Sequence, residues 1–214
     1  MTMRNKLRRL CIISGFALIF AAFCLCVFNI AESRTAARRS KASLSELKDI
    51  IGKAPEPTAA ASTEDDLFAR YDEPAPAEIP TVSIDNTGYC GYLTIAELGL
   101  ELPVINDFSY EALDTAPCRY SGSAESNNII IAAHNFGSHF GKLGSISDGA
   151  EIVFTDCSGR SFRYSIISIE EIRGSDVEEM LSKESSPWDM TLFTCTLSGK
   201  SRITVRAKLI NNNN

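Results

Sequence analysis

The sequence is poor in the residues that mark nucleic-acid-binding and metal-binding proteins. Its 214 residues include 21 Lys and Arg against 27 Asp and Glu, a formal net charge of -6, with two histidines and one tryptophan. Nucleic-acid-binding domains usually carry a basic face, so this balance excludes such a partner. The acids Glu170-Glu171 and Asp176–Glu179 lack the spacing of a calcium-binding loop, and we interpret them as a solvated surface.

Closely spaced cysteine pairs are also missing from the part of the chain that could form a globular domain. Three of the seven cysteines lie in an apolar N-terminal run, and four follow it: Cys90, Cys118, Cys157 and Cys195. Zinc sites need pairs such as Cys-x2-Cys, so we predict no metal site and no other cofactor. Cys90, Cys118 and Cys157 are interpreted as small buried side chains, with a disulfide among them as the alternative.

A run of 21 uncharged residues, 10–30, follows a basic segment at residues 1–9. About 20 apolar residues cross the hydrocarbon core of a bilayer, whereas the apolar core of a signal peptide has only about 7–15. The run therefore predicts a single transmembrane anchor. A cleaved signal peptide is the alternative, although no small-x-small cleavage site follows Asn29.

The orientation of this span is not decided by its flanking charges. Four basic residues precede the run and four follow it: Arg4, Lys6, Arg8 and Arg9 before it, and Arg34, Arg38, Arg39 and Lys41 after it. The positive-inside rule therefore favours neither orientation. We expect a cytoplasmic N-terminus and an extracellular C-terminal part because of the chemistry argued below.

Residues 31–87 read as a connection between the span and a globular domain. Ala31–Gly52 contains helix formers, with Leu44, Leu47 and Ile51 at helical spacing, and predicts a short stalk helix. Lys53–Asn86 holds five of the eight prolines and an Ala/Thr/Ser tract with several acids, which is linker composition. We expect the catalytic domain at residues 88–210 and a solvated tail at 211–214.

The domain itself has the pattern of β structure. Seven segments rich in β-branched and aromatic residues predict strands: Tyr92–Leu98, Leu100–Ile105, Asn128–Ala133, Glu151–Thr155, Ser161–Ile172, Met190–Leu197 and Arg202–Leu209. Tyr110–Asp114 and Val177–Lys183 are expected to be short helices. Seven or eight short strands with one or two helices favour a mainly β fold, a closed or nearly closed barrel.

The two histidines follow the apolar strand Asn128–Ala133. His134 comes directly after it, so a rigid strand would fix the position of this residue, as a reactive site requires. His139 lies farther along the polar loop, and we interpret it as a satisfied surface or core residue.

Cys195 ends a predicted strand on which Thr191, Phe193 and Cys195 share one face. If Ser198-Gly199 form a two-residue hairpin loop, Cys195 stands directly opposite Arg202, with Cβ atoms about 4.5–5.5 Å apart. A nearby guanidinium stabilises a thiolate and can bind an oxyanion. Cys195, His134 and Arg202 together would support acyl transfer, although sequence alone does not bring His134 to Cys195.

These residues resemble the sortase family. The resemblance is carried by the signature Thr-Leu-x-Thr-Cys, by two opening strands and by the histidine region, which here read Thr191–Cys195, Gly91–Ile95, Leu102–Val104, Ala133–Asn135 and Phe140–Leu143. It covers essentially the whole domain. His134-Asn135 and Asp189 are similar to class B members, but the domain is short for that class and lacks a long helix before the signature, so the subclass stays open.

The resemblance implies an eight-stranded sortase β-barrel and a cysteine transpeptidase. Such an enzyme cuts a Leu-Pro-x-Thr-Gly-like sorting signal on a surface or pilin protein through a thioester. It then passes the protein to an amine of a peptidoglycan precursor or of a pilin lysine. By position, His134, Cys195 and Arg202 take the catalytic roles, and Thr194 lines the substrate side; Arg206 is the competing arginine.

Two other functions use the same features. A membrane-tethered cysteine endopeptidase would use water in place of an acceptor amine. A non-catalytic, anchored β-barrel would bind a partner without any nucleophile. Only the first of these keeps the catalytic roles of Cys195 and His134.

Overall fold

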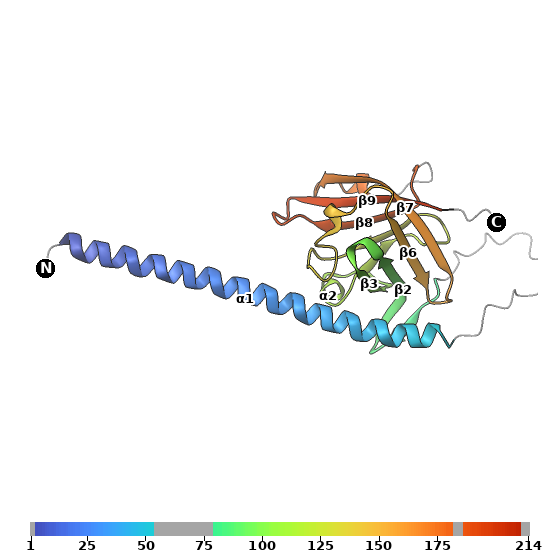
Figure 1. Ribbon diagram of the computed structural model, residues 1–214, viewed down its shortest axis with the longest axis horizontal. Helices are drawn as coiled ribbons and strands as arrows, with labels where there is room; N and C mark the ends of the chain where they lie inside the picture. The colour runs from blue at the N-terminus through green and yellow to red at the C-terminus, as the bar shows by residue number, and fades with distance from the viewer. Residues whose placement is uncertain (1–2, 54–78, 182–185, 211–214) are drawn as a thin grey trace, which may run out of the picture.

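The computed structural model describes residues 3–53, 79–181 and 186–210 and consists of one long helix beside a β-barrel (Figure 1). The helix, α1, spans Met3–Ile51. It is long and apolar enough from Cys11 onward to cross a membrane, as expected of a single-pass anchor. The side chains of the apolar run are exposed, for example Phe16 and Leu18, which suits contact with lipid. Most of the predicted linker and all of the tail 211–214 lie outside the described residues.

Within the described ranges, nine strands follow α1: β1 Val82–Ile84, β2 Thr87–Ile95, β3 Leu100–Ile105, β4 Cys118–Ser121, β5 Ile129–Ala132, β6 Glu151–Asp156, β7 Ser161–Arg173, β8 Met190–Cys195 and β9 Ser201–Leu209. One short α-helix, α2 Tyr110–Leu113, and three 3-10 turns connect them, at Ala96–Leu98, Leu143–Ser145 and Val177–Met180. The fold is therefore mainly β, as predicted.

Strands β2 to β9 close into an eight-stranded barrel in the order β2-β3-β4-β5-β8-β9-β7-β6, and β6 pairs with β2 to complete the ring. Closure depends on Gly91, where β2 is irregular and joins both β3 and β6. Gly91 has φ of 154°, and a Cβ there would lie 2.2 Å from the carbonyl oxygen of Thr155. Any residue with a Cβ at this position would force β2 and β6 apart.

Two hydrophobic clusters hold the fold together. One fills the barrel with residues such as Leu93, Ile131 and Leu192. The other covers the outside of the wall and joins Leu47 of α1 and Leu113 of α2 to wall residues such as Phe193. Strands β5 and β8 are therefore buried on both faces, which fixes the backbone at the point where each strand ends.

The structure shows two strands and one packing contact that the sequence pattern did not predict. Strand β1 lies within the segment interpreted as linker and pairs with β2. Strand β4 makes one parallel pair with β3 and an irregular antiparallel ladder with β5. The part of α1 beyond Ile30, expected to be a plain stalk, packs against the barrel through β3, β1 and β2.

Candidate active site

The parallel pairing of β5 with β8 brings His134 and Cys195 to the same end of the barrel. The register runs from Ile129 opposite Met190 to Ala132 opposite Phe193. Beyond these pairs, the amide of Ala133 donates to the carbonyl of Phe193 at 3.2 Å. The paired residues end two positions before His134 and Cys195, so the same register, continued along both strands, would set these two residues side by side.

The backbone around His134 is fixed by a tight loop. The amide of Phe140 donates to the carbonyl of His134 at 3.1 Å. Gly141 lies so close to this loop that a Cβ on it would be 2.5 Å from the carbonyl oxygen of Asn135. The Phe136 ring lies 4.9 Å from the imidazole, centroid to centroid.

Asp114 orients the imidazole of His134. Its Oδ1 lies 3.0 Å from Nε2 of His134, and both side chains are partly exposed. Asp114 directly follows α2, so this carboxylate reaches the site from a different element. A carboxylate on one ring nitrogen fixes the direction of the ring and selects the tautomer of the neutral imidazole. Sequence reasoning placed Asp114 at the end of a helix and missed this contact.

Cys195 and Arg202 are directly opposite each other in the β8–β9 ladder, which confirms the predicted register. The turn itself differs from the predicted two-residue loop. The amide of Thr196 donates to the carbonyl of Ser201, and the amide of Gly199 donates to the carbonyl of Thr196. The connection therefore contains four residues, 197–200, and an even number keeps the same residues paired.

The guanidinium of Arg202 is held by its own hairpin. Nη1 donates to the carbonyl oxygens of Gly199 and Ser201, each at 3.1 Å. An arginine has five N–H donors, and those on Nε and Nη2 of Arg202 make no hydrogen bond to the described residues. Arg202 pairs directly with Cys195 but is not among the residues that line the groove beside Cys195.

Arg206, the alternative arginine for the catalytic role, makes its contacts away from Cys195. Its guanidinium lies 3.8 Å from the centre of the Trp188 ring and forms a 3.2 Å ion pair with Glu170. Nη2 also donates to the carbonyl of Glu179 at 2.9 Å. These contacts tie the segment between β7 and β8 to the barrel wall, so Arg206 has a structural role.

A groove of about 690 Å³ opens beside Cys195. Its walls come from the loop after His134, from the β8–β9 turn and from β9, and they include Asn135, Phe140, Lys142, Thr194, Leu197 and Ile203. Thr194 also links β8 to the end of β5, because its hydroxyl donates to the carbonyl of Ala133 at 2.8 Å. The groove is large enough for several residues of an extended peptide.

The other three cysteines of the barrel are buried free thiols. Each Sγ donates to a backbone carbonyl: Cys90 to Val104, Cys118 to Ala116 and Cys157 to Tyr89. Burial raises the pKa of Cys90 and of Cys118 to about 12 and that of Cys157 to about 11. They match the interpretation as small core side chains and not the alternative of a disulfide.

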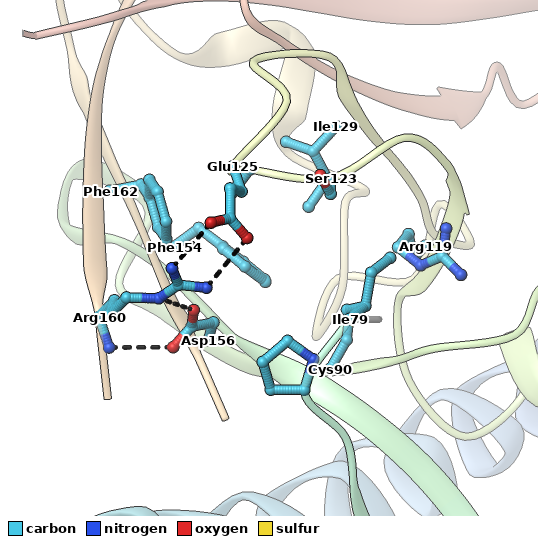
Figure 2. A pocket seen from close by; sticks show the side chains of 12 residues that line it. Ile79, Cys90, Arg119, Ser123, Glu125, Ile129, Phe154, Asp156, Arg160 and Phe162 are labelled. Atoms are coloured by element: carbon cyan, nitrogen blue, oxygen red, sulfur yellow. Dashed lines mark hydrogen bonds and ion pairs between the residues drawn. The ribbon is translucent and has the colours of Figure 1, made fainter. Parts of the chain in front are cut away.

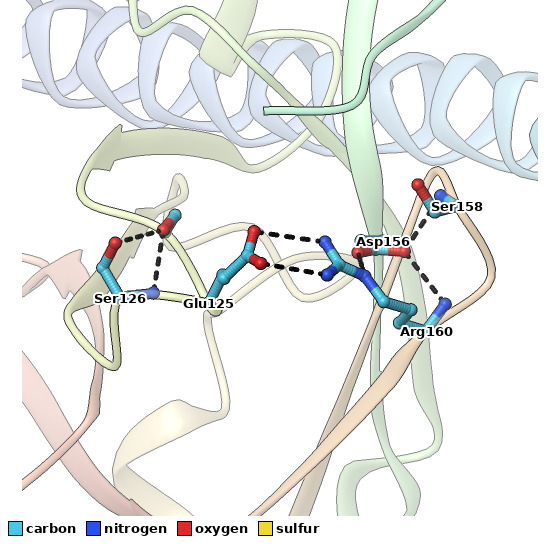
Figure 3. A network of polar contacts seen from close by, with 6 residues as sticks. Glu125, Ser126, Asp156, Ser158 and Arg160 are labelled. Atoms are coloured by element: carbon cyan, nitrogen blue, oxygen red, sulfur yellow. Dashed lines mark hydrogen bonds and ion pairs between the residues drawn. The ribbon is translucent and has the colours of Figure 1, made fainter. Parts of the chain in front are cut away.

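A second cavity borders Cys90, but it holds only about 30 Å³ and cannot take a peptide (Figure 2). Arg160 lies at its edge and bridges two carboxylates, Glu125 and Asp156 (Figure 3). These hydrogen bonds raise the pKa of Arg160 further. The arrangement ties the β4–β5 loop to the β6–β7 hairpin, which is a structural function.

His139 is fully buried, and neither of its ring nitrogens has a hydrogen-bond partner among the described residues. Burial lowers its pKa to about 4, with a smaller contribution from His134. The sequence interpretation as a satisfied residue is therefore wrong on its hydrogen bonding. His139 belongs to the packing behind the site loop, with the Phe136 ring 5.6 Å away.

The Sortase domain family model matches residues 93–210, more than half of the chain. Sortase A of Bacillus anthracis is 24% identical over 132 residues, which cover 59% of this chain and 61% of that relative, less than two thirds of its length.

Among solved structures, a Clostridium perfringens sortase D5 transpeptidase has a TM-score of 0.52 at 24% identity, covering 57% of this chain and 79% of that one. Streptococcus agalactiae sortase C1 has a TM-score of 0.53 at 22% identity, covering 61% and 72%. These relatives belong to different sortase classes and share the barrel fold. The chain belongs to the sortase family.

Proposed function

We propose that this chain is a membrane-anchored sortase that uses Cys195 as nucleophile, His134 as acid and base, and Arg202 as oxyanion stabiliser. One observation carries the proposal. The β8–β9 register pairs Cys195 with Arg202, the β5–β8 register ends two residues before His134 and Cys195, and Cys195 lines a groove of about 690 Å³; this arrangement supports the three roles. The other cysteines in the barrel wall lie buried, away from this groove.

The first half of the reaction forms a thioester. The thiolate of Cys195, whose proton resides on His134, attacks the carbonyl carbon of a peptide bond, and the carbonyl oxygen takes up the π electron pair and is stabilised by Arg202. When the C–N bond breaks, the imidazolium of His134 gives its proton to the leaving amine. Asp114 holds that imidazolium in place through the 3.0 Å contact with Nε2.

The second half transfers the acyl group. An acceptor amine attacks the thioester carbon, and neutral His134 takes the proton that the amine loses. The C–S bond breaks and returns the electron pair to Cys195 as thiolate. Water in place of the amine would give hydrolysis, so the acceptor alone separates a transpeptidase from an endopeptidase.

The substrate that we propose is a surface or pilin protein with a Leu-Pro-x-Thr-Gly-like sorting signal, cut between Thr and Gly. The acceptor would be an amine of a peptidoglycan precursor or of a pilin lysine. The open, partly apolar groove beside Cys195 supports a peptide substrate. We also propose a cytoplasmic N-terminus and an extracellular barrel, because this substrate and acceptor lie outside the cell.

The test uses the full chain in detergent with a peptide that contains Leu-Pro-x-Thr-Gly, with and without added triglycine or a lysine peptide. Mass spectrometry should show the acceptor joined to the Thr carbonyl. Hydrolysed peptide alone, at every acceptor concentration, would make the protein an endopeptidase. Cleavage that continues unchanged in Cys195→Ala would leave a barrel without the proposed chemistry.

A further inference from the structure

The helix that carries the apolar run continues without a break along the barrel. Beyond Ile30, one face of α1 is buried at Ala36, Ser40, Leu44 and Leu47, a helical spacing. Lys48 forms an ion pair with Glu101 and lies 5.1 Å from the centre of the Tyr92 ring. The helix is thus a docked part of the fold.

The membrane-side part of this docked helix reaches the candidate active site. The hydroxyl of Ser138, in the loop after His134, donates to the carbonyl of Ser33 at 3.4 Å. A hollow of about 370 Å³ is lined on one side by Asn29, Ile30, Ser33 and Arg34 and on the other by residues 135–137 and Leu197. In Figure 1 the β8–β9 turn points toward the N-terminal half of α1. The site therefore lies at the level where the apolar run ends.

Leu197 is the most exposed large apolar side chain of the described residues, with 98% of its surface open. A single exposed leucine is ordinary on a protein surface. This one shares a hollow with Ile30, the last residue of the span, and is flanked by exposed Arg34 on the helix and exposed Lys200 on the turn. An apolar tip with basic neighbours matches the boundary between acyl chains and anionic headgroups.

We propose that the β8–β9 turn is a lipid-binding element, with Leu197 inserted into the interface of the same bilayer that holds α1. The inference rests on the proposed membrane anchor. A lipid surface is favoured over another protein because the turn is continuous with the span and is held beside it by the docked helix. The groove beside Cys195 then opens at the membrane surface.

The test places a tryptophan at the turn of the full chain. Leu197→Trp is made in a Trp188→Phe background, which keeps an aromatic ring beside Arg206. The matched control is Ile167→Trp, because Ile167 is also exposed but lies on β7, away from the turn. Each variant is reconstituted as one chain per nanodisc, with lipids brominated in the upper acyl chain, and unchanged circular dichroism verifies folding.

We expect bromolipids to remove most of the emission of Trp at position 197 and little of the emission at position 167. Equal emission loss at both positions, or none at 197, would overturn the inference. Loss at 197 caused only by a quencher-labelled substrate peptide would assign the turn to the substrate and also overturn it. The measurement needs no turnover, so an inactive enzyme with a lipid-bound turn would reject the proposed function and not the lipid contact.

Discussion

The four cysteines of the barrel occupy two kinds of place. Cys90, Cys118 and Cys157 are packed among apolar side chains, where their hydrogen bonds to carbonyl groups and their raised pKa keep them protonated. Cys195 stands at the open end of β8, opposite an arginine and beside a groove. We therefore expect the reactive thiol at the end of a strand, where a rigid backbone meets an accessible surface.

Replacing the proposed nucleophile should separate the two kinds of cysteine most clearly. Cys195→Ala should lower kcat by on the order of 10⁶-fold, the scale seen when a covalent nucleophile is removed. Cys157→Ala is the matched control and should keep its activity, with a loss of about 1 kcal/mol in unfolding free energy. Peptide cleavage assays and denaturant unfolding measure both, and equal losses of activity would contradict the distinction.

Thiol reactivity tests the same comparison without turnover. At neutral pH, a pKa raised from 9.0 to about 12 reduces the thiolate of Cys90 about 10³-fold. Iodoacetamide should therefore modify Cys195 in the folded protein and reach the three buried thiols only after unfolding. Peptide mapping by mass spectrometry assigns each site, and early labelling of Cys118 in the folded state would show that the interior opens.

The arginines allow a third comparison. Arg202→Ala should lower kcat by about 10²–10³, as expected when an oxyanion donor is removed. Arg206→Ala should retain much of the activity but unfold more easily, because its ion pair with Glu170 and its contact with the Trp188 ring are lost. If Arg206→Ala lost more activity than Arg202→Ala, the oxyanion would lie closer to Arg206 than to Arg202, which is the residue paired with Cys195.

The buried His139 should make stability depend on pH. Its pKa falls from 6.5 to about 4 on folding, so between these values the unfolded chain binds a proton that the folded chain does not. Stability should be complete above about pH 6.5 and fall by roughly 3 kcal/mol as the pH approaches 4. Urea unfolding at several pH values should show this slope reduced in His139→Leu; an unchanged slope would assign it to other groups.

The smallest effect is expected at Asp114. Asp114→Asn keeps the size of the side chain but removes its charge, which should lower kcat about tenfold, a small part of the 10²–10⁴ from general acid–base catalysis. The unfolding free energy should stay nearly the same, because both side chains at this contact are partly exposed. Glu111→Gln, on the neighbouring helix α2, is the control. A lower kcat together with a clear loss of unfolding free energy would point to a packing role instead.

Much of the barrel could be predicted because its strands are strongly patterned. Leu100–Ile105 has the same bounds in the structure as in the sequence prediction, and the pairing of Cys195 with Arg202 is confirmed. Strand β4 was missed because its four residues make only one pair with β3 and an irregular ladder with β5. Such short strands depend on distant partners and not on a local pattern.

The parts of the site that were not predicted from the sequence also depend on contacts between distant residues. Asp114 and His134 are 20 residues apart, and only the packed fold brings them together. The strand register placed Arg202 opposite Cys195 but could not give its side-chain direction, which its hydrogen bonds to the turn determine. Along α1, the small residues Ala36 and Ser40 concealed the buried face, so docking against the barrel was not expected.

The parallel β5–β8 pairing also has a consequence for the newly made protein. Ile129 pairs with Met190 and Ala132 with Phe193, so contacts that are distant along the chain must form before His134 meets Cys195. Pairings of this kind have a high loop-closure cost and form late in folding. With the roles proposed for Cys195 and His134, an unfinished chain would therefore carry its thiol without its acid, and the proposed activity would arise only in the finished barrel.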